Sequence, residues 1–378
     1  MSNKKKICFV VSAVGTARSF FKDHIERLSE NFDVYLVANV QDNDDLSDFK
    51  IKGYKAIQIE RQPSIWADIK SVFQLKNYFR EESFYCVHAM ASKPSLVTAI
   101  AGWMARVPHR IRIFTGQRWC DMKGLKRRFF IMLDKITVAL NTELMTDGFS
   151  QREYLEEQGV LKKKQAVVMA NGSICGVDTQ RFCYSDETRY DERKKLGFED
   201  EVVYMFLGRM KTDKGINELL AAFDRMVASS PKAVLLLVGA DEENCHQRLS
   251  DYSNLVDGKN VIFYGYTKTP NLLLQAADVF CMPSYREGFG LSVLEASCVR
   301  LPVICSDVYG MRDTMVDNVT GIRCKVRDVD SLYDAMYELY GDEAKRKQLG
   351  LAGYERVAKD FSKKLVTDAW YEYYMGLK

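Results

Sequence analysis

Short apolar runs of three to six residues alternate along this chain with longer segments in which apolar residues recur every three or four positions. The short runs are typical of strands buried on both faces of a parallel sheet, and the longer segments are typical of amphipathic helices. Alternation of this kind predicts an α/β fold with doubly wound sheets. Strands are predicted at residues 6–11, 34–37, 56–59, 86–89, 110–114, 202–207, 233–238, 261–264, 278–282 and 303–305, and the helical patterns of the first half lie at 20–28, 67–81 and 93–106.

The alternation is interrupted between residues 171 and 186, where no apolar period is sustained. A chain of 378 residues also exceeds the usual size of a single core. Two domains are therefore predicted, at residues 1–178 and 179–360, with the hinge at 171–186. The helix predicted at 361–374 is rich in aromatic residues, so we expect it to pack against the rest of the chain.

The composition of the chain excludes some classes of protein but does not define a function. The chain is 47% hydrophobic and 28% charged, and its net charge of +3 gives no general case for binding nucleic acid. No segment has the apolar length of a membrane-spanning helix, and the amino-terminal residues lack a signal-peptide cleavage site, so we expect a cytoplasmic protein. The ten cysteines are scattered and mostly lie in apolar runs, which favours buried reduced thiols.

A strand, a glycine-rich turn and a helix are predicted around residues 278–296. Pro283 and Ser284 end the strand, and Gly288 and Gly290 permit a tight turn into a helix that begins near Leu291. The first amides of such a helix favour an anion. Two carboxylates, Glu287 and Glu295, bracket the turn, and as acceptor-only groups they suit the hydroxyl pairs of a ribose or a hexose. The alternative is a solvated loop with a capping glutamate.

A second strand-to-helix loop carries cations. Arg209, Lys211 and Lys214 follow the strand predicted at 202–207, where fixed positive charge suits a diphosphate and the charge of a leaving group. The alternative is a solvated lysine-rich turn. The first loop of the chain, residues 12–16, lacks a dinucleotide fingerprint but can pass close to a ligand at Gly15.

Three polar positions are predicted to meet at the carboxyl ends of neighbouring strands in the first domain. His88 lies in the strand at 86–89, Lys93 follows it, and Thr115 with Gly116 ends the next strand. Ligands of open α/β sheets bind at this edge. A lone histidine is also often structural, and both interpretations of His88 stay open.

Residues 119–135 contain the most basic stretch of the chain. Leu125, Phe129, Phe130, Met132 and Leu133 give it an apolar stripe, and Trp119 comes just before it. These features predict an interfacial helix that lies on anionic lipid. An ordinary surface helix with a core face explains them equally well, and both can hold at once.

Asp42 and Asp44 have a spacing at which two carboxylates can hold a divalent metal. These carboxylates lie in a uniformly acidic loop with no apolar strand leading into it, so solvated turn residues are the better interpretation. No metal site is predicted.

With these residues in place, the whole chain resembles the retaining glycosyltransferases of family 4, which have the GT-B fold of two Rossmann-like domains facing a central cleft. The resemblance rests mainly on Glu287-x7-Glu295, with support from Gly208-Arg209, Lys214-Gly215, Asn171-Gly172 and Gly176-Val177-Asp178. It implies that residues 361–378 form a helix that crosses back to the N-terminal domain.

The resemblance also implies roles for single residues. Arg209 and Lys214 would hold the donor diphosphate, Glu295 the ribose, and Glu287 the transferred sugar beside its anomeric carbon. The candidate catalytic residues are thus Glu287, Arg209, Lys214 and His88, the further donor-binding residues are Gly15, Gly288, Phe289, Gly290, Leu291, Ser292 and Glu295, and the acceptor-side residues are Lys93, Thr115 and Gly116.

A narrower resemblance is to bacterial polysaccharide enzymes that extend polyprenyl-diphosphate-linked sugars. It is carried by residues 87–93, 106–111, 115–119 and 150–151. Those relatives often have His-x-His where this chain has His88 and Met90. If the second histidine is the one that contacts the donor sugar, that contact is missing here.

The resemblance implies transfer of a hexose or N-acetylhexosamine from a UDP-sugar to a lipid-linked saccharide, with an alpha linkage, no cofactor and no metal. The enzyme would work at the inner face of the plasma membrane, on anionic lipid. Two alternatives stay open: a nucleotide-sugar epimerase of similar fold, which would need acid/base residues around the sugar, and a catalytically silent membrane-surface subunit of a glycan assembly complex.

Overall fold

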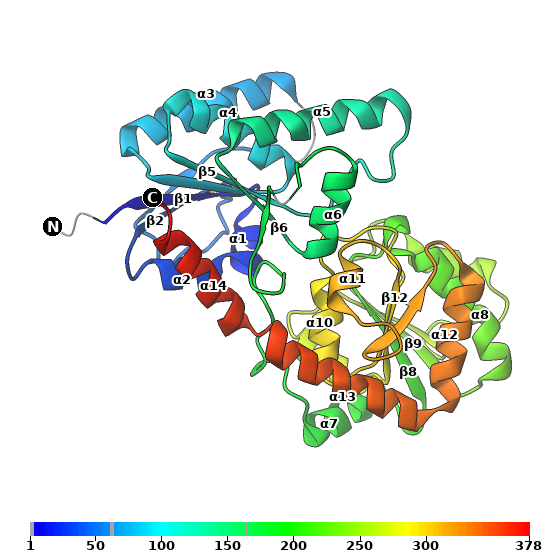
Figure 1. Ribbon diagram of the computed structural model, residues 1–378. Helices are drawn as coiled ribbons and strands as arrows, with labels where there is room; N and C mark the ends of the chain where they lie inside the picture. The colour runs from blue at the N-terminus through cyan, green and yellow to red at the C-terminus, as the bar shows by residue number, and fades with distance from the viewer. Residues whose placement is uncertain (1–3, 61–63, 164) are drawn as a thin grey trace. The chain divides into compact units, whose positions relative to one another are not determined.

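The computed structural model describes residues 4–60, 64–163 and 165–378. The chain forms two compact units (Figure 1). Unit 1 contains residues up to Gly176 together with Lys364–Lys378, and unit 2 contains Val177–Lys363. The division after Gly176 lies two residues before the boundary predicted at 178.

Unit 1 is built on a parallel sheet of seven strands in the order β3-β2-β1-β4-β5-β6-β7. The strands are β1 (Lys6–Val10), β2 (Asp33–Ala38), β3 (Gly53–Ala56), β4 (Cys86–Met90), β5 (His109–Phe114), β6 (Glu143–Thr146) and β7 (Val167–Val168). The helices are α1 (Val14–Phe20), α2 (Lys22–Leu28), α3 (Ile65–Glu82), α4 (Ser92–Ala105), α5 (Gly124–Leu140), α6 (Phe149–Glu157) and α14 (Lys363–Met375).

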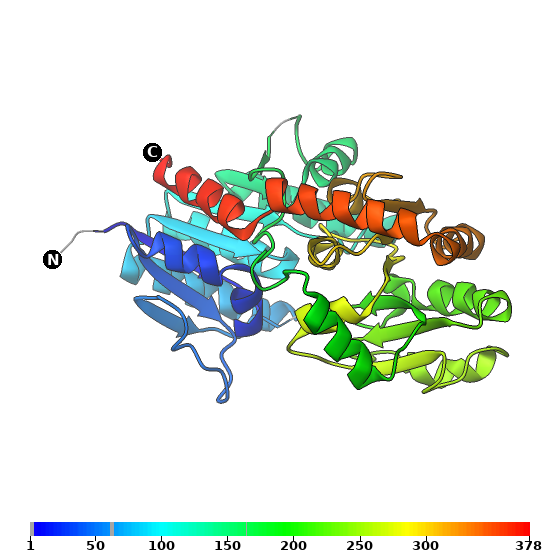
Figure 2. The same ribbon diagram turned by 90° about the horizontal axis from the view of Figure 1, so that it is seen from below.

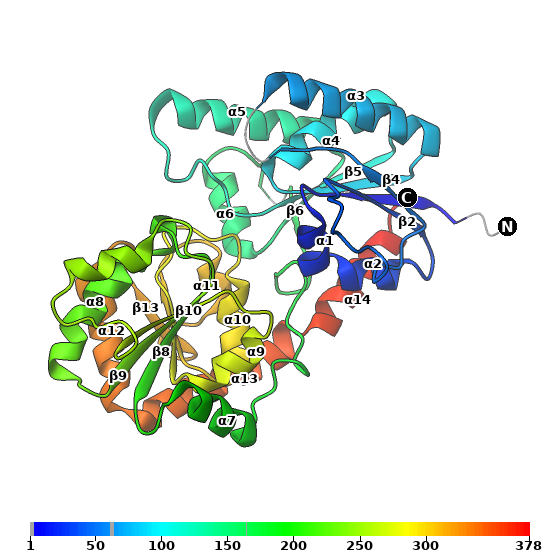
Figure 3. The same ribbon diagram turned by 180° about the vertical axis from the view of Figure 1, so that it is seen from behind.

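The sheet of unit 1 is covered on both faces, because successive residues of a strand point to opposite sides. Ile7 and Phe9 of β1 pack against α1, α2 and α14, whereas Cys8 and Val10 pack against α3 and α4. Figures 1 and 3 show α3, α4 and α5 together on one side of this sheet, and Figure 2 shows the red α14 beside the blue α2 on the other side.

Unit 2 has a parallel sheet of six strands in the order β10-β9-β8-β11-β12-β13. Its strands are β8 (Val202–Leu207), β9 (Ala233–Val238), β10 (Val261–Gly265), β11 (Val279–Met282), β12 (Val303–Ser306) and β13 (Gly321–Cys324). Its helices are α7 (Asp186–Leu196), α8 (Ile216–Ser229), α9 (Pro270–Leu273), α10 (Leu291–Cys298), α11 (Met311–Thr314), α12 (Val329–Gly341) and α13 (Glu343–Asp360), with short 3₁₀ turns η1 (Thr212–Lys214), η2 (Cys245–Asp251) and η3 (Leu274–Ala276).

Each sheet has one point where the strand order reverses. In unit 1 this point lies between β1 and β4, and in unit 2 it lies between β8 and β11. The loops that leave neighbouring strands there run in opposite directions and leave space for a ligand at the carboxyl edge of the sheet. The loops after β8 and β11 are those that carry the predicted cations and carboxylates.

The predicted α/β class and the two Rossmann-like domains are confirmed. The boundaries of β8 and β9 match the prediction, but β3 ends at Ala56, where the predicted strand 56–59 begins. Ile57 and Ile59 are buried beyond the end of the strand. The helix predicted at 20–28 is divided at Phe21 into α1 and α2. Strands β6, β7 and β13 were not predicted.

No helix in the described ranges is both long and apolar enough to cross a bilayer. All ten cysteines are free thiols, and eight of them are buried.

Helix α14 completes the core of unit 1. Trp370 is fully buried, with its ring stacked on His88 at 5.1 Å and on His24 at 4.3 Å. Burial lowers the pKa of His88 to about 3 and that of His24 to about 4, so both rings are neutral near pH 7.

We expect Trp370→Ala to lower the free energy of unfolding of unit 1 by about 3–5 kcal/mol, because the substitution removes a large buried ring. Urea unfolding followed by circular dichroism measures the change. Met375→Ala is the matched control on the same helix, since Met375 is half exposed. An equal decrease in the free energy of unfolding for the two substitutions would show that α14 is not part of the core.

Candidate active site

The loop after β8 is held against the loop after β11. Gly215 has a φ of +73°, and a Cβ atom there would lie 2.1 Å from the carbonyl oxygen of Pro283. The Tyr285 amide donates to the Asp213 carbonyl at 2.9 Å, and the Arg286 guanidinium is 2.8 Å from the Asp213 carboxylate. The two loops therefore form one rigid surface.

Lys214 and Glu287 form an ion pair across these loops, between Nζ and Oε1. The side chains are only 18% and 14% exposed, so water screens the pair weakly. The Ser284 hydroxyl donates to the same Oε1 at 2.9 Å. The structure thus brings together two of the predicted catalytic residues.

Arg209 and Lys211 share a carboxylate from a third loop. Glu242, which follows β9, lies 3.4 Å from Arg209 Nη1 and 3.0 Å from Lys211 Nζ. These side chains are more exposed than Lys214 and Glu287, and exposed ion pairs contribute little stability. An anion of higher charge can therefore replace Glu242 at low cost.

The turn before α10 is fixed by packing on both sides. The buried Phe289 ring packs on Phe361 at 5.8 Å, so this side chain anchors the turn. Gly290 is left-handed, and Gly310 presses on the turn from the loop after β12: a Cβ atom at Gly310 would lie 2.5 Å from the Gly288 oxygen. Leu291 and Ser292 form the first helical turn, whose amides have no partner within the helix.

Glu295 is the carboxylate of the site with no hydrogen bond to the described part of the chain. Burial raises its pKa to about 7, and the charge of Arg181 opposes this rise. A half-buried carboxyl without a donor is ready to accept hydroxyl groups of a ligand.

Comparison with known proteins identifies a family for the second half of the chain. Residues 188–356 match the family model of glycosyl transferases group 1. These residues form a glycosyl transferases group 1 domain, and the chain is a glycosyltransferase. It is 27% identical to the capsular polysaccharide biosynthesis glycosyltransferase CapM of Staphylococcus aureus over 97% of this chain and 95% of the relative.

A second relative is the UDP-Gal:alpha-D-GlcNAc-diphosphoundecaprenol alpha-1,3-galactosyltransferase of Escherichia coli, at 23% identity over 83% of this chain and 82% of the relative. Among solved structures, HepE of Anabaena in complex with UDP and glucose superposes with a TM-score of 0.81, at 17% identity over 99% of this chain and all of the other. This similarity shows the fold, and the glycosyltransferase has the GT-B architecture.

His88 occupies a different environment from the open rim that the sequence predicted. Its side chain is fully buried, and its Nδ1 lies 2.6 Å from the Tyr374 hydroxyl. Phe9, Phe21 and Trp370 enclose the ring. In this position His88 joins β4 to α14, and it contacts no open surface.

The other predicted residues of unit 1 lie at the carboxyl edge of its sheet. Gly15 is in the first turn of α1, where an added Cβ atom would meet nothing within 4 Å. Lys93 lies in the first turn of α4 and forms an ion pair with Asp68 of α3 at 2.6 Å. Thr115 and Gly116 follow β5, and the Thr115 carbonyl accepts from Gln151 at 2.8 Å.

The basic stretch has both an exposed apolar row and a side that packs on the core. Leu125, Phe129 and Met132 of α5 are exposed, whereas Phe130 packs on a core cluster. Trp119 differs from the prediction: it is 2% exposed and donates to Asp134 at 2.6 Å, so it belongs to the core.

Sequence reasoning missed three supporting residues of the glycosyltransferase site. Asp213 joins the loops, Glu242 pairs with the cations, and Gly310 supports the turn at Gly288. The glycine was the one with a sequence signal, because it ends the loop after a predicted strand. The two acidic residues lie in polar stretches that give no indication of their partners.

No cluster of three or more His, Cys, Asp or Glu side chains suited to a metal occurs in the described ranges. Asp44 accepts from the Gln41 amide at 2.9 Å, as a turn residue does.

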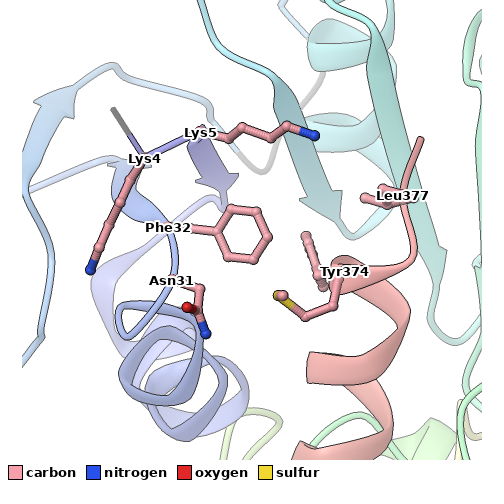
Figure 4. A pocket seen from close by; sticks show the side chains of 7 residues that line it. Lys4, Lys5, Asn31, Phe32, Tyr374 and Leu377 are labelled. Atoms are coloured by element: carbon pink, nitrogen blue, oxygen red, sulfur yellow. The ribbon is translucent and has the colours of Figure 1, made fainter. Parts of the chain in front are cut away.

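Unit 1 has a cavity of about 440 Å³ beside the amino end of β1, lined by Lys4, Lys5, Asn31, Phe32, Tyr374, Met375 and Leu377 (Figure 4). Lys4 donates to the carbonyls of Ser29 and Glu30, and Lys5 lies over the Tyr85 ring. The cavity is at the opposite edge of the sheet from Gly15 and Lys93, and its cations already have partners.

Gly310→Ala is expected to lower kcat/KM at least tenfold, because the new Cβ atom displaces the Gly288 carbonyl and with it Glu287. Gly258→Ala is the matched control: Gly258 is also left-handed, but its Cβ atom would meet nothing within 4 Å. Steady-state kinetics of both variants separates displacement of the turn from the general penalty of a left-handed alanine. Equal losses would refute the role of Gly310.

Glu295→Gln is expected to stabilise the protein at pH 8 by about 1–3 kcal/mol. The folded-state pKa is about 7, above the ordinary value, so the native state binds more protons than the unfolded state between these two values. The free energy of unfolding of the wild type therefore decreases as the pH rises between these two pKa values. That of the variant shows no such decrease.

Thermal unfolding from pH 4 to pH 8 measures the difference between wild type and variant. Glu355→Gln, in an exposed part of α13, is the control. A difference that is independent of pH would contradict the raised pKa of Glu295.

Proposed function

We propose that this glycosyltransferase moves a hexose or N-acetylhexosamine from a UDP-sugar to a polyprenyl-diphosphate-linked saccharide with retention of configuration, in surface polysaccharide assembly. The observation that carries the proposal is the Lys214–Glu287 ion pair at the strand reversal of unit 2, beside the first amides of α10. The ammonium group of Lys214 can bind a diphosphate, and the carboxylate of Glu287 can accept hydrogen bonds from a sugar.

The donor is proposed to bind mainly to residues of unit 2, with Gly15 of unit 1 as a further donor-binding residue. Its diphosphate replaces the carboxylates that now pair with Arg209 and Lys214, since phosphate oxygens carry more charge and form stronger hydrogen bonds. This exchange frees Glu287 for the sugar. Glu295 accepts hydrogen bonds from the ribose, and backbone groups of Gly288, Gly290 and Leu291 hold phosphate or sugar oxygens.

Support for a UDP-sugar comes from two similar proteins. The solved HepE structure contains UDP and glucose, and the name of the E. coli relative specifies UDP-Gal. The same relative acts on a diphosphoundecaprenol-linked sugar, which supports the lipid-linked acceptor proposed here. The S. aureus relative belongs to capsular polysaccharide biosynthesis.

The proposed reaction proceeds on one face of the sugar. The bond between the anomeric carbon and the diphosphate oxygen breaks, and the acceptor oxygen forms its bond to the same face. The departing phosphate accepts the proton of the acceptor hydroxyl, while Arg209, Lys214 and the α10 amides stabilise its negative charge. Glu287 orients the sugar and stabilises the positive charge at the anomeric carbon. An alpha-linked donor then gives an alpha-linked product.

The acceptor is proposed to contact Lys93, Thr115 and Gly116 of unit 1, which lie at the carboxyl edge of that sheet. The basic helix α5 would place the enzyme on the cytoplasmic face of the plasma membrane, where a polyprenyl diphosphate is embedded. Three cations near the diphosphate supply positive charge, so we propose a reaction that needs no metal.

The two alternative functions make different demands on substrates. An epimerase acts on the nucleotide sugar alone, and His88 is too enclosed to serve as its acid or base. A silent subunit turns over no substrate. Incubation with a panel of nucleotide sugars, with and without a polyprenyl-diphosphate sugar, separates these from transfer, which requires both substrates.

Arg209→Ala and Glu287→Gln are each expected to lower kcat/KM for transfer by about 10²–10³-fold, because each removes charge stabilisation near the reacting atoms. Radiolabelled donor and lipid-linked acceptor provide the assay. Lys232→Ala is the control: Lys232 is an exposed cation before β9, at the opposite sheet edge.

Activity is expected to persist in EDTA, and the coupling constant of the anomeric proton should report an alpha product. Wild-type rates in both variants would contradict the site, and an inverted product would contradict the same-face route.

A further inference from the structure

Large apolar side chains are exposed along three neighbouring helices of unit 1. Trp66, Leu125 and Ile65 are exposed by 83%, 81% and 76%, and Trp103 is exposed by 59%. Ile69 and Phe73 of α3 and Phe129, Met132 and Ile136 of α5 are also exposed. This number of exposed large apolar residues in one layer exceeds what scattered surface residues explain.

The exposed residues follow the helical repeat. On α3, Ile65, Ile69 and Phe73 are four residues apart and so lie in one row, while Val72, Leu75 and Phe79 face the core. On α5, the row is Leu125, Phe129, Met132 and Ile136. Each helix therefore has two apolar sides, one for the sheet and one for the outside.

Helix α4 connects the two rows. It packs against both α3 and α5, and the three helices lie side by side in Figures 1 and 3. Apolar residues of α4 also lie near its outer side: Leu96 and Ile100 are half-buried, and Trp103 is exposed. We call the outward surface of α3, α4 and α5 the docking face.

The charges of the docking face are mostly positive. Lys70, Lys76 and Arg80 accompany the row on α3, and Lys126, Arg128 and Lys135 accompany the row on α5. The three helices contain four acidic residues, and three of these have cationic partners: Asp68 pairs with Lys93, Glu82 with Lys6, and the buried Asp134 with Arg112.

One of these ion pairs connects the docking face to the acceptor side. Asp68 lies in the first turn of α3, next to the exposed Ile65 and Trp66, and its partner Lys93 is a predicted acceptor-side residue. The apolar end of α3 is thus adjacent to the place where a lipid-linked diphosphate is proposed to bind.

We propose that the docking face, and not α5 alone, binds the surface of an anionic bilayer, with Trp66 and Trp103 in the interfacial layer. The inference rests on the proposed lipid-linked acceptor. A broad face that combines exposed tryptophans, aliphatic side chains and lysines or arginines complements the boundary between acyl chains and anionic headgroups. The adjacency of Asp68 and Lys93 then holds the acceptor side at the bilayer surface.

Tryptophan fluorescence tests this placement directly. The chain has four tryptophans, and the two outside the docking face, Trp119 and Trp370, are buried. Vesicles of phosphatidylglycerol and phosphatidylcholine are expected to shift the emission to the blue and to protect it from acrylamide. In the Trp103→Phe variant, the remaining exposed tryptophan is Trp66, which reports the insertion of α3. In the Trp66→Phe variant it is Trp103, which reports the insertion of α4.

Vesicle flotation measures how much each helix contributes. Trp66→Ser with Ile69→Ser on α3, and Leu125→Ser with Phe129→Ser on α5, are each expected to weaken partitioning by about tenfold or more. Lys126→Glu with Arg128→Glu should abolish the preference for phosphatidylglycerol. Tyr190→Ser is the matched control, because Tyr190 is an exposed aromatic residue on α7 of unit 2. Unchanged thermal unfolding verifies that each variant is folded.

Two transfer assays separate this inference from the proposed function. With a short-chain acceptor in solution, the α3 variant should transfer sugar at the wild-type rate, and with a long-chain acceptor in vesicles it should lose activity in parallel with binding. Absence of transfer by the wild type in both assays would refute the proposed function while leaving the flotation result valid.

Three results would overturn the inference: no vesicle binding by the wild type, full binding by the α3 variant, or loss of a dimer by that variant in sedimentation equilibrium. The last outcome would show that a second copy of the chain covers the face.

Discussion

Two backbone segments of unit 2 meet where Gly215 touches Pro283, and the positions of the charged groups depend on that contact. Strands β8 and β11 are parallel neighbours, so the loops that follow them leave the sheet at the same edge. A side chain at position 215 would keep the loops apart, since its Cβ atom would overlap the Pro283 carbonyl. With the loops in contact, Asp213 bonds to Tyr285 and Arg286, and Lys214 reaches Glu287. Because Gly215 has no side chain, the two loops can meet, and this contact determines the positions of Asp213, Lys214 and Glu287.

The charged groups of the site differ in how firmly they are held. Lys214 and Glu287 are shielded from water, and Ser284 donates to Glu287, whereas Arg209 and Lys211 meet Glu242 at an exposed position. The first pair costs more to separate and holds its two atoms in place, and the second yields easily to a competing anion. Glu295 is different again, because its pKa is raised and no residue in the described ranges donates a hydrogen bond to it, which leaves its carboxyl open to a ligand. A site arranged in this way combines a rigid reacting centre with an adaptable periphery.

The sequence predicted most accurately those features that depend on local pattern. The continuous apolar runs of β8 and β9 gave their boundaries, and the glycines before Leu291 gave the start of α10. Short strands such as β6 and β7 escaped prediction, because four or two residues carry too little periodicity. His88 was placed correctly in a strand, but its surroundings come from Tyr374, 286 positions away. The exposed row on α3 was missed for a similar reason. A helix with two apolar sides looks like a core helix until the sheet shows which side it covers.

The last residues of unit 1 have a consequence for how the chain acquires its structure during synthesis. Trp370 and Tyr374 fill the core between β1, β4 and α2, yet they follow the whole of unit 2 in the sequence. Unit 2 is one continuous segment, so it can fold as soon as it leaves the ribosome. Unit 1 begins first but must wait, with His24 and His88 uncovered, until α14 emerges. The amino-terminal half is therefore the later of the two units to complete its core, although its synthesis begins first.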